Sequence, residues 1–246
     1  MGLINSVVRH SMFKTKSKSS QVDSPVDSAM KTMKEIINSL KESPVTLVLI
    51  LLNIVVHFTP FHFILGFDLW NASQNCIQPR TAMSSVLMGD LAVNRLILSA
   101  FMHVNDVHLI YNMVSLGWKG INLEKAQGPQ AFLKLVFYAI VATNILFVVL
   151  GCSLNALRMQ PTTSHFNTCT LGFSGAIFCL KYVWNTLSPN ETTTVAGVKI
   201  PSKTAAWAEL LLISSVVPNT SVVSHVAGIL AGYLYMEYAR QYALMK

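Results

Sequence analysis

Six stretches of predominantly apolar residues run along this chain, and they limit the folds that it can adopt. Each supplies most of the ~20 apolar residues that a helix needs to cross a bilayer. Only 12% of the 246 residues are charged and 52% are hydrophobic, whereas a soluble domain usually carries about a quarter charged residues. We therefore predict an all-α membrane protein with six transmembrane helices. No strand is predicted, because the alternating segments of a membrane barrel, about ten residues each, are missing. The helices are expected near residues 44–66, 107–123, 131–151, 171–188, 204–218 and 220–239.

The chain divides into one membrane domain with a tail on each side. Residues 1–43 are rich in Ser and Lys and lack the pattern of a cleavable signal peptide, in which a basic start is followed at once by an apolar core. We predict a disordered, basic, cytosolic tail rather than a dedicated binding arm, with a short surface helix possible over residues 27–42. The membrane domain is expected over 44–239, and residues 240–246 form a short second tail.

The net charge of +7 is explained by orientation in a membrane rather than by nucleic-acid binding. Cytosolic connections of membrane proteins carry an excess of Lys and Arg. With a cytosolic amino terminus, fifteen of the 18 Lys and Arg residues lie on the cytosolic side, including Lys134 and Lys181, whose side chains would have to extend from within helices to the surface. Both termini are therefore predicted to be cytosolic. Of the glycosylation sequons, Asn71 is predicted to be non-cytosolic, Asn190 cytosolic, and Asn219 too close to the membrane for modification.

The four cysteines have neither the spacing of a metal site nor that of a disulfide framework. Cys179 falls within a predicted helix, where we expect it to pack. Cys76 and Cys169 fall on the same, non-cytosolic side of the membrane and are able to meet there. The sequence leaves open whether they pair.

Polar groups inside membrane helices are costly, which makes them candidates for function. His108 and Asn112 are four residues apart on one face of the second helix. The fourth helix begins near Ser174, and the sixth carries His225 near its start. Because these three helices all run inward from the non-cytosolic side, the four polar groups share one depth. Glycines that permit close helix approach lie beside them, namely Gly175, Gly228 and Gly232.

Each of these features has an ordinary explanation when taken alone. A membrane serine commonly bonds to its own helix, a GxxxG pair commonly serves packing, and a histidine commonly bonds a neighbouring carbonyl. Together they supply a serine, a base and side-chain donors, which is the inventory of a serine hydrolase. Zinc proteases are disfavoured because HExxH is absent, aspartyl proteases because no Asp lies within a predicted helix, and transporters because no inverted repeat is visible. We predict no metal and no cofactor.

The motifs His103-x4-His108-x3-Asn112, Gly172-Phe-Ser174-Gly175 and His225-x2-Gly228-x3-Gly232 resemble those of the rhomboid intramembrane serine proteases, in order and spacing, across residues 44–239. Arg95 and Glu124 also fall where that family carries an Arg and a Glu. The stretches "WKGINLE" and "GFSGAIFCLK" are similar to one branch of the family. Members of that branch reside in the endoplasmic reticulum and cleave unstable membrane proteins bound for degradation.

The resemblance implies an intramembrane serine endopeptidase that cleaves transmembrane segments near the non-cytosolic face. Ser174 would be the nucleophile and His225 its general base, acting as a dyad without a third acid. His108, Asn112 and the backbone N–H of Ser174 would hold the oxyanion, and His103 would support the preceding loop. The expected partners are transmembrane protein substrates and the lipid bilayer, with no nucleic acid. The expected location is the endoplasmic reticulum membrane.

Two departures from the family pattern bear on this interpretation. Phe178 occupies the position where many rhomboids carry a Tyr that stacks on the catalytic histidine, so that the ring is kept and the hydroxyl is lost. The sequence ends at Lys246, and we therefore expect no ubiquitin-binding tail to couple it to degradation machinery. The alternative function is that of an inactive rhomboid-like protein that binds membrane helices. Such relatives generally lack the serine or the histidine, and both are present here.

Overall fold

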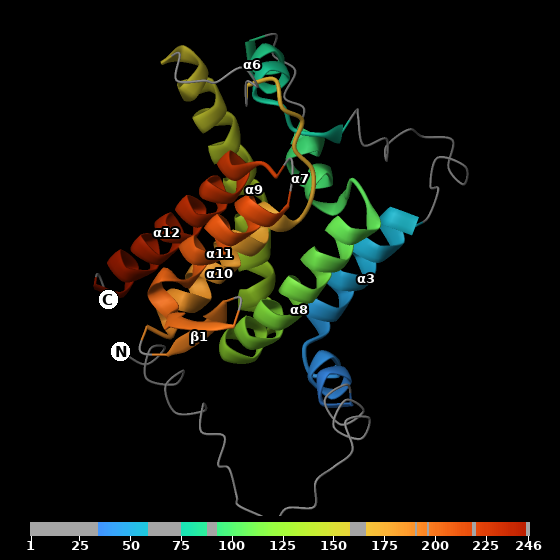
Figure 1. Ribbon diagram of the computed structural model, residues 1–246, viewed down its shortest axis with the longest axis vertical. Helices are drawn as coiled ribbons and strands as arrows, with labels where there is room; N and C mark the ends of the chain where they lie inside the picture. Colours follow the sequence, from blue (N-terminus) through green and yellow to red (C-terminus); the bar gives the residue numbers. More distant parts are fainter. Residues whose placement is uncertain are drawn as a thin grey trace, which may run out of the picture.

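The computed structural model describes residues 34–58, 75–87, 93–157, 166–189, 191–195, 197–217 and 220–244, and these are mainly helical (Figure 1). The three glycosylation sequons, at Asn71, Asn190 and Asn219, lie outside the described residues, and the predictions for them stay untested. The labelled helices are α3 (Pro44–Phe58), α6 (Pro79–Leu87), α7 (Val93–Phe101), α8 (Asp106–Gln127), α9 (Pro129–Ala156), α10 (Ser174–Leu187), α11 (Ser202–Val216) and α12 (Val222–Leu244). A further helix covers Lys34–Lys41, and two strands, β1 (Thr192–Val195) and β2 (Val198–Pro201), follow α10.

Each of the six predicted segments contains a helix, in the order α3, α8, α9, α10, α11 and α12. The prediction that the chain contains no strands was wrong. Strands β1 and β2 form an antiparallel hairpin between α10 and α11, where Gly197, at φ +82°, supplies the left-handed conformation of the turn. The strands have four residues each. They are therefore much shorter than the membrane-barrel strands of about ten residues on which the prediction was based. Helices α6 and α7, which lie between the first two predicted segments, were also not predicted.

Length and hydropathy together select α9, with 28 residues, as the one described helix able to cross a membrane by itself. Helix α3 joins it as a second candidate if it is counted with Lys34–Lys41, from which it is bent by 105°. Helices α3, α10 and α11 have only 14 or 15 residues. The number of six membrane crossings therefore stays a prediction.

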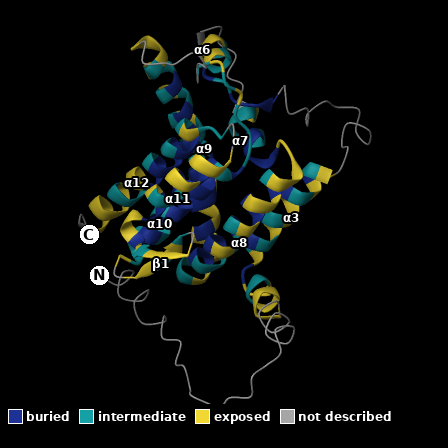
Figure 2. Cartoon of the chain, in the orientation of Figure 1, coloured by how far each residue is buried: buried dark blue, intermediate teal, exposed yellow. Residues whose placement is uncertain are grey.

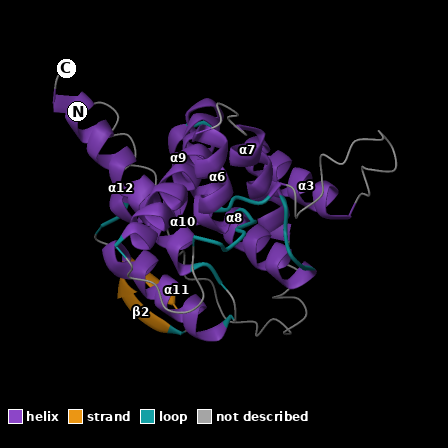
Figure 3. Ribbon diagram, turned by 90° about the horizontal axis from the view of Figure 1, so that it is seen from above, coloured by secondary structure: helices purple, strands orange, loops and turns teal. Residues whose placement is uncertain are grey.

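Helices α8, α10 and α12 begin at the same end of the bundle, where α6 and α7 also lie (Figure 1). At this end Ile77 and Thr170, which precede α6 and α10, pair as a short antiparallel bridge. His57, at the end of α3, contacts Asp106 at the start of α8. The β hairpin lies beside α11 (Figure 3). It connects the last residue of α10 to the first residue of α11. The common starting end is the arrangement that the alternating topology predicts.

Helix α10 forms the centre of the bundle and packs against α8, α9, α11 and α12. Its sequence is apolar on nearly every side, which suits a helix surrounded by others, and its side chains are mostly buried (Figure 2). The outer helices instead expose large apolar side chains, as at Val48 (61% exposed), Ile110 (61%) and Leu211 (70%). Exposed apolar faces around a core that contains polar residues are expected when lipid is the solvent.

Glu124 and a glycine turn fix how α3, α8 and α9 meet. The buried carboxylate of Glu124 on α8 accepts hydrogen bonds from the Val45 and Thr46 N–H groups, at 2.9 and 2.8 Å. These are orphan donors of the first turn of α3, where a negative charge is favourable. Gly128, at φ +83°, then ends α8, and Pro129 begins α9. Glu124, which directly follows the second predicted helix, thus anchors the start of the first predicted helix.

The prediction that Lys181 extends to the membrane surface was wrong. Lys181 is 3% exposed, and its ammonium group forms an ion pair with Glu209 of α11. Because α10 is surrounded by other helices, this side chain finds its partner inside the bundle. The predicted charge difference across the membrane is still large without Lys181.

Candidate active site

Ser174 is the first residue of α10, and the loop before it is held by α7. Gly172 has φ +108°, a conformation that favours glycine, and its N–H donates to the Ser99 carbonyl at 2.9 Å. The Phe173 ring is fully buried and lies edge-on to Phe101, with ring centroids 5.6 Å apart. The backbone before α10 is thus held to α7 by a hydrogen bond and by a contact between two rings. The first N–H groups of a helix lack partners within it and carry its positive dipole end, and here they lie at the serine.

His225, in the first turn of α12, faces Ser174. Its Nε2 lies 3.0 Å from Ser174 Oγ, and the residue is 5% exposed. The Phe178 ring stacks on the imidazole, with centroids 4.5 Å apart and planes inclined by 31°. Among the described residues His225 Nδ1 has no hydrogen-bond partner. The geometry is therefore that of a Ser–His pair without a third acid in the described part of the chain, and a Phe ring is sufficient to stack on the imidazole.

The glycines of α10 and α12 allow these two helices to approach closely. A Cβ added at Gly228 would meet the Gly175 carbonyl oxygen and would lie 3.0 Å from Phe178 Cβ. One added at Gly232 would lie 2.9 Å from the Cys179 carbonyl oxygen, and one at Gly175 would lie 3.2 Å from Ser224 Oγ of α12. Side chains at these positions would push the helices apart, and with them the serine and the histidine.

His108 and Asn112 converge on the backbone two residues before Ser174. A Cβ added at Gly172 would lie 2.8 Å from His108 Nε2 and 3.4 Å from Asn112 Nδ2, so only glycine leaves room for both side chains. Asn112 is 1% exposed, and its Nδ2 has no hydrogen-bond acceptor among the described residues. A buried amide left without an acceptor is costly. This arrangement suits a donor that waits for an incoming negative oxygen.

Comparison with known proteins agrees with this geometry. A model of the rhomboid domain matches residues 91–242, more than half of the chain. The chain belongs to the rhomboid family. Its similar proteins include "Rhomboid-like protein 14, mitochondrial" of Arabidopsis thaliana, 42% identical over 151 residues. "Rhomboid-related protein 4" of Mus musculus, from the branch that the sequence stretches indicated, is 36% identical over 143 residues.

The matched regions cover 61% and 58% of this rhomboid chain but only 45% of each relative. The chain therefore spans about half the length of the curated relatives that it matches. A third relative, "Rhomboid-like protein 15" of Arabidopsis thaliana, is 28% identical over 155 residues, which cover 38% of its length.

The family's further histidine, His103, lies in the loop between α7 and α8 and is buried. Its ring centroid is 5.1 Å from that of His108 and 6.4 Å from that of His57. Burial, and after it the neighbouring His108, lower the pKa of His103 to about 3. The ring is therefore neutral at physiological pH. It lies beside the rings of His57 at the end of α3 and His108 in the first turn of α8. Within the described ranges, no group of His, Cys, Asp and Glu side chains has the geometry of a metal site.

Sequence reasoning missed one feature near the site of this rhomboid and left a second one open. The Lys181–Glu209 pair lies beneath the dyad, and Lys181 Nζ is 4.9 Å from the centroid of the Phe178 ring that stacks on His225. The available signal was Glu209, a charged residue in the middle of the fifth apolar stretch. The second feature is a disulfide between Cys76 and Cys169, for which the sequence offered only a shared side of the membrane.

Proposed function

We propose that this rhomboid is an intramembrane serine endopeptidase that cleaves transmembrane segments near the non-cytosolic face. The observation that carries the proposal is the 3.0 Å contact between Ser174 Oγ and Nε2 of the buried His225. This distance is within the range in which a base takes the proton of a nucleophile. Rhomboid membership supports a protease of the intramembrane type.

The proposed mechanism uses the dyad twice. His225 Nε2 takes the hydroxyl proton as Ser174 Oγ attacks a peptide carbonyl carbon, and then gives the proton to the leaving amine. Water next attacks the acyl-enzyme, with His225 again as the base. A neutral His225 with its proton on Nδ1 has the free lone pair at Nε2 that the first step requires. Stacking on Phe178 holds the ring in this orientation.

Developing negative charge on the carbonyl oxygen would be stabilised by donors already in place. Asn112 Nδ2 and the His108 ring converge beside Gly172, and the backbone N–H of Ser174 lies at the start of a helix. Preorganised donors of this kind typically contribute about 100- to 1,000-fold to turnover. The unpaired amide of Asn112 supports this assignment most directly.

The proposed setting is a bundle of six membrane-spanning helices with both termini in the cytosol. The charge asymmetry and the apolar outer faces support this arrangement. The Cys76–Cys169 disulfide lies at the Ser174 end, and disulfides persist in oxidising compartments. This supports an active-site end that faces the lumen of the endoplasmic reticulum, which we propose as the location. Proposed partners are unstable transmembrane proteins and, downstream, degradation machinery.

The deciding experiment uses purified protein in liposomes with a labelled transmembrane substrate that contains a helix-weakening segment. Wild type is expected to release fragments, and Ser174→Ala is expected to release none. His225→Ala should lose nearly as much activity, and the double variant should be no worse than Ser174→Ala, because one mechanism is lost only once. Equal fragment yields from wild type and Ser174→Ala would refute the proposal. A binding protein would instead capture substrate in every variant and release no fragments.

A further inference from the structure

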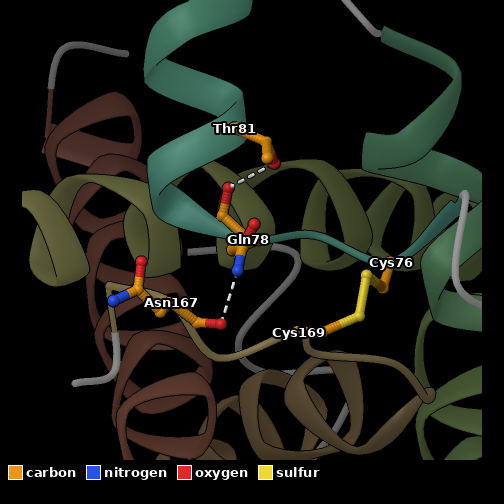
Figure 4. Close-up of a disulfide and its surroundings, with 5 residues drawn as sticks. All are labelled: Cys76, Gln78, Thr81, Asn167 and Cys169. Carbon is orange, nitrogen blue, oxygen red and sulfur yellow. Dashed lines mark hydrogen bonds between the residues drawn. A yellow bond between two sulfur atoms is a disulfide. The ribbon is translucent and has the colours of Figure 1, made fainter.

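The segment before α6 and the segment before α10 are joined by a continuous set of contacts (Figure 4). The disulfide between Cys76 and Cys169 links residues 93 positions apart in sequence, with Cα atoms 5.4 Å apart. Next to it, Ile77 and Thr170 exchange two backbone hydrogen bonds, at 2.8 and 3.1 Å. The disulfide is thus embedded in a short antiparallel pairing of the two segments.

Hydrogen bonds extend the same pairing on the side away from Ser174. Gln78 Nε2 donates to the Asn167 carbonyl (Figure 4), and the Arg80 N–H donates to the Phe166 carbonyl at 3.0 Å. Together with the disulfide, these contacts fix residues 166–170 to residues 76–80. We call this arrangement the clamp.

The clamp ends four residues before the serine. After Thr170 the chain passes through Leu171 to Gly172, which contacts both His108 and Asn112, and then reaches Ser174. The backbone between the clamp and α10 is held in addition by the Gly172–Ser99 hydrogen bond. A shift of residues 169–173 would therefore move the nucleophile and the backbone N–H of Ser174 relative to the dyad partner and the oxyanion donors.

We propose that Cys76 and Cys169 are positioning residues for the serine, and that cleavage by this protein requires their disulfide. This inference rests on the proposed protease function. Ile77 of the clamp shares a core cluster with Ala227 of α12, and His225 reaches Ser174 from the same helix. Oxidation of the clamp therefore sets the position of one dyad member relative to the other, and it makes activity depend on the redox state at the active-site end.

The two redox states are connected by ordinary thiol–disulfide exchange. Cys169 is exposed, whereas Cys76 is buried. A dithiothreitol thiolate attacks the Cys169 sulfur, the S–S bond breaks, and Cys76 leaves as a thiolate that takes up a proton. The second dithiothreitol thiol then closes its ring and releases Cys169 as a thiol. Dithiothreitol loses two electrons and the protein disulfide gains them. A disulfide oxidant such as diamide reverses the change.

The test compares kinetics of the full chain in liposomes before and after dithiothreitol, with thiol content verified by mass spectrometry. Reduction of wild type, and the variant Cys76→Ser with Cys169→Ser, are each expected to lower kcat by roughly 10- to 100-fold, because misplacement of about 1 Å has that effect. KM should change little, because the substrate-binding surfaces remain. Fluorophosphonate labelling of Ser174 should slow, amide exchange of residues 166–173 should accelerate, and diamide should restore wild type.

A matched control is Cys152→Ser, which removes the free thiol of α9 and leaves a hydroxyl that can donate to the Pro79 carbonyl in its place. This variant should keep wild-type kcat and remain sensitive to dithiothreitol, whereas the double serine variant should be insensitive. The proposal is overturned if reduced wild type keeps its kcat, or if the only change is a lower unfolding temperature. Oxidised wild type without any cleavage would instead refute the protease function itself, and with it the clamp's role.

Discussion

Replacement of Gly228 by Ala tests whether the contact between α10 and α12 sets the dyad geometry. The added methyl carbon would lie 3.0 Å from Phe178 Cβ and 3.1 Å from the Gly175 carbonyl carbon, and closer still to the Gly175 oxygen. Carbon atoms in ordinary contact are about 3.5–4.0 Å apart, and the closer oxygen is the tightest contact, so the two helices have to separate by about 1 Å or more. A displacement of this size can cost about 100-fold in turnover. Overpacking of this kind typically costs about 1–3 kcal/mol of stability.

The expected result for Gly228→Ala is a folded protein with a drop in kcat on the order of 100-fold. Cleavage of a labelled substrate in liposomes measures the rate, and thermal unfolding measures the stability. Gly117→Ala is the matched control, because a Cβ there would lie 3.7 Å from Ile50 Cδ1, in ordinary contact. That control should keep full activity. Wild-type kcat in folded Gly228→Ala, or an equal loss in Gly117→Ala, would refute the reasoning.

Three other predictions concern the oxyanion site, the Lys181–Glu209 ion pair and the membrane topology. Asn112→Ala should lower turnover by roughly tenfold to a thousandfold and slow fluorophosphonate labelling less than loss of the nucleophile does; unchanged turnover would remove Asn112 from the oxyanion site. Lys181→Met alone, which leaves the partly buried Glu209 without its partner, should destabilise the protein by up to about 3–5 kcal/mol, whereas Met at both positions should be close to neutral. Equal unfolding temperatures for the single and double variants would contradict this account of the ion pair. In endoplasmic reticulum membranes, a glycan is expected on Asn71 and none on Asn190, and a glycan found on Asn190 by glycosidase shift would invert the proposed topology.

The sequence by itself predicted the six main helices and the residues that meet at the candidate site. Helical periodicity is local, so His108 and Asn112 are recognisable as neighbours on one face without any knowledge of the fold. The alternation of membrane helices then places the starts of the second, fourth and sixth at one end. These two regularities account for the expectation that Ser174 and His225 lie at one depth, and the structure brings their side chains to 3.0 Å.

Contacts that depend on the path of the chain in three dimensions were decided only by the tertiary structure. Cys76 and Cys169 are 93 residues apart, and nothing local in either segment specifies its partner. The sequence does not determine whether the Lys181 ammonium group reaches the membrane surface or a partner within the bundle. Because α10 lies at the centre of the bundle, the group pairs with Glu209. Pairing of this kind depends on which helices become neighbours, which no local pattern encodes. Packing of the whole bundle therefore determines both the clamp and the buried ion pair.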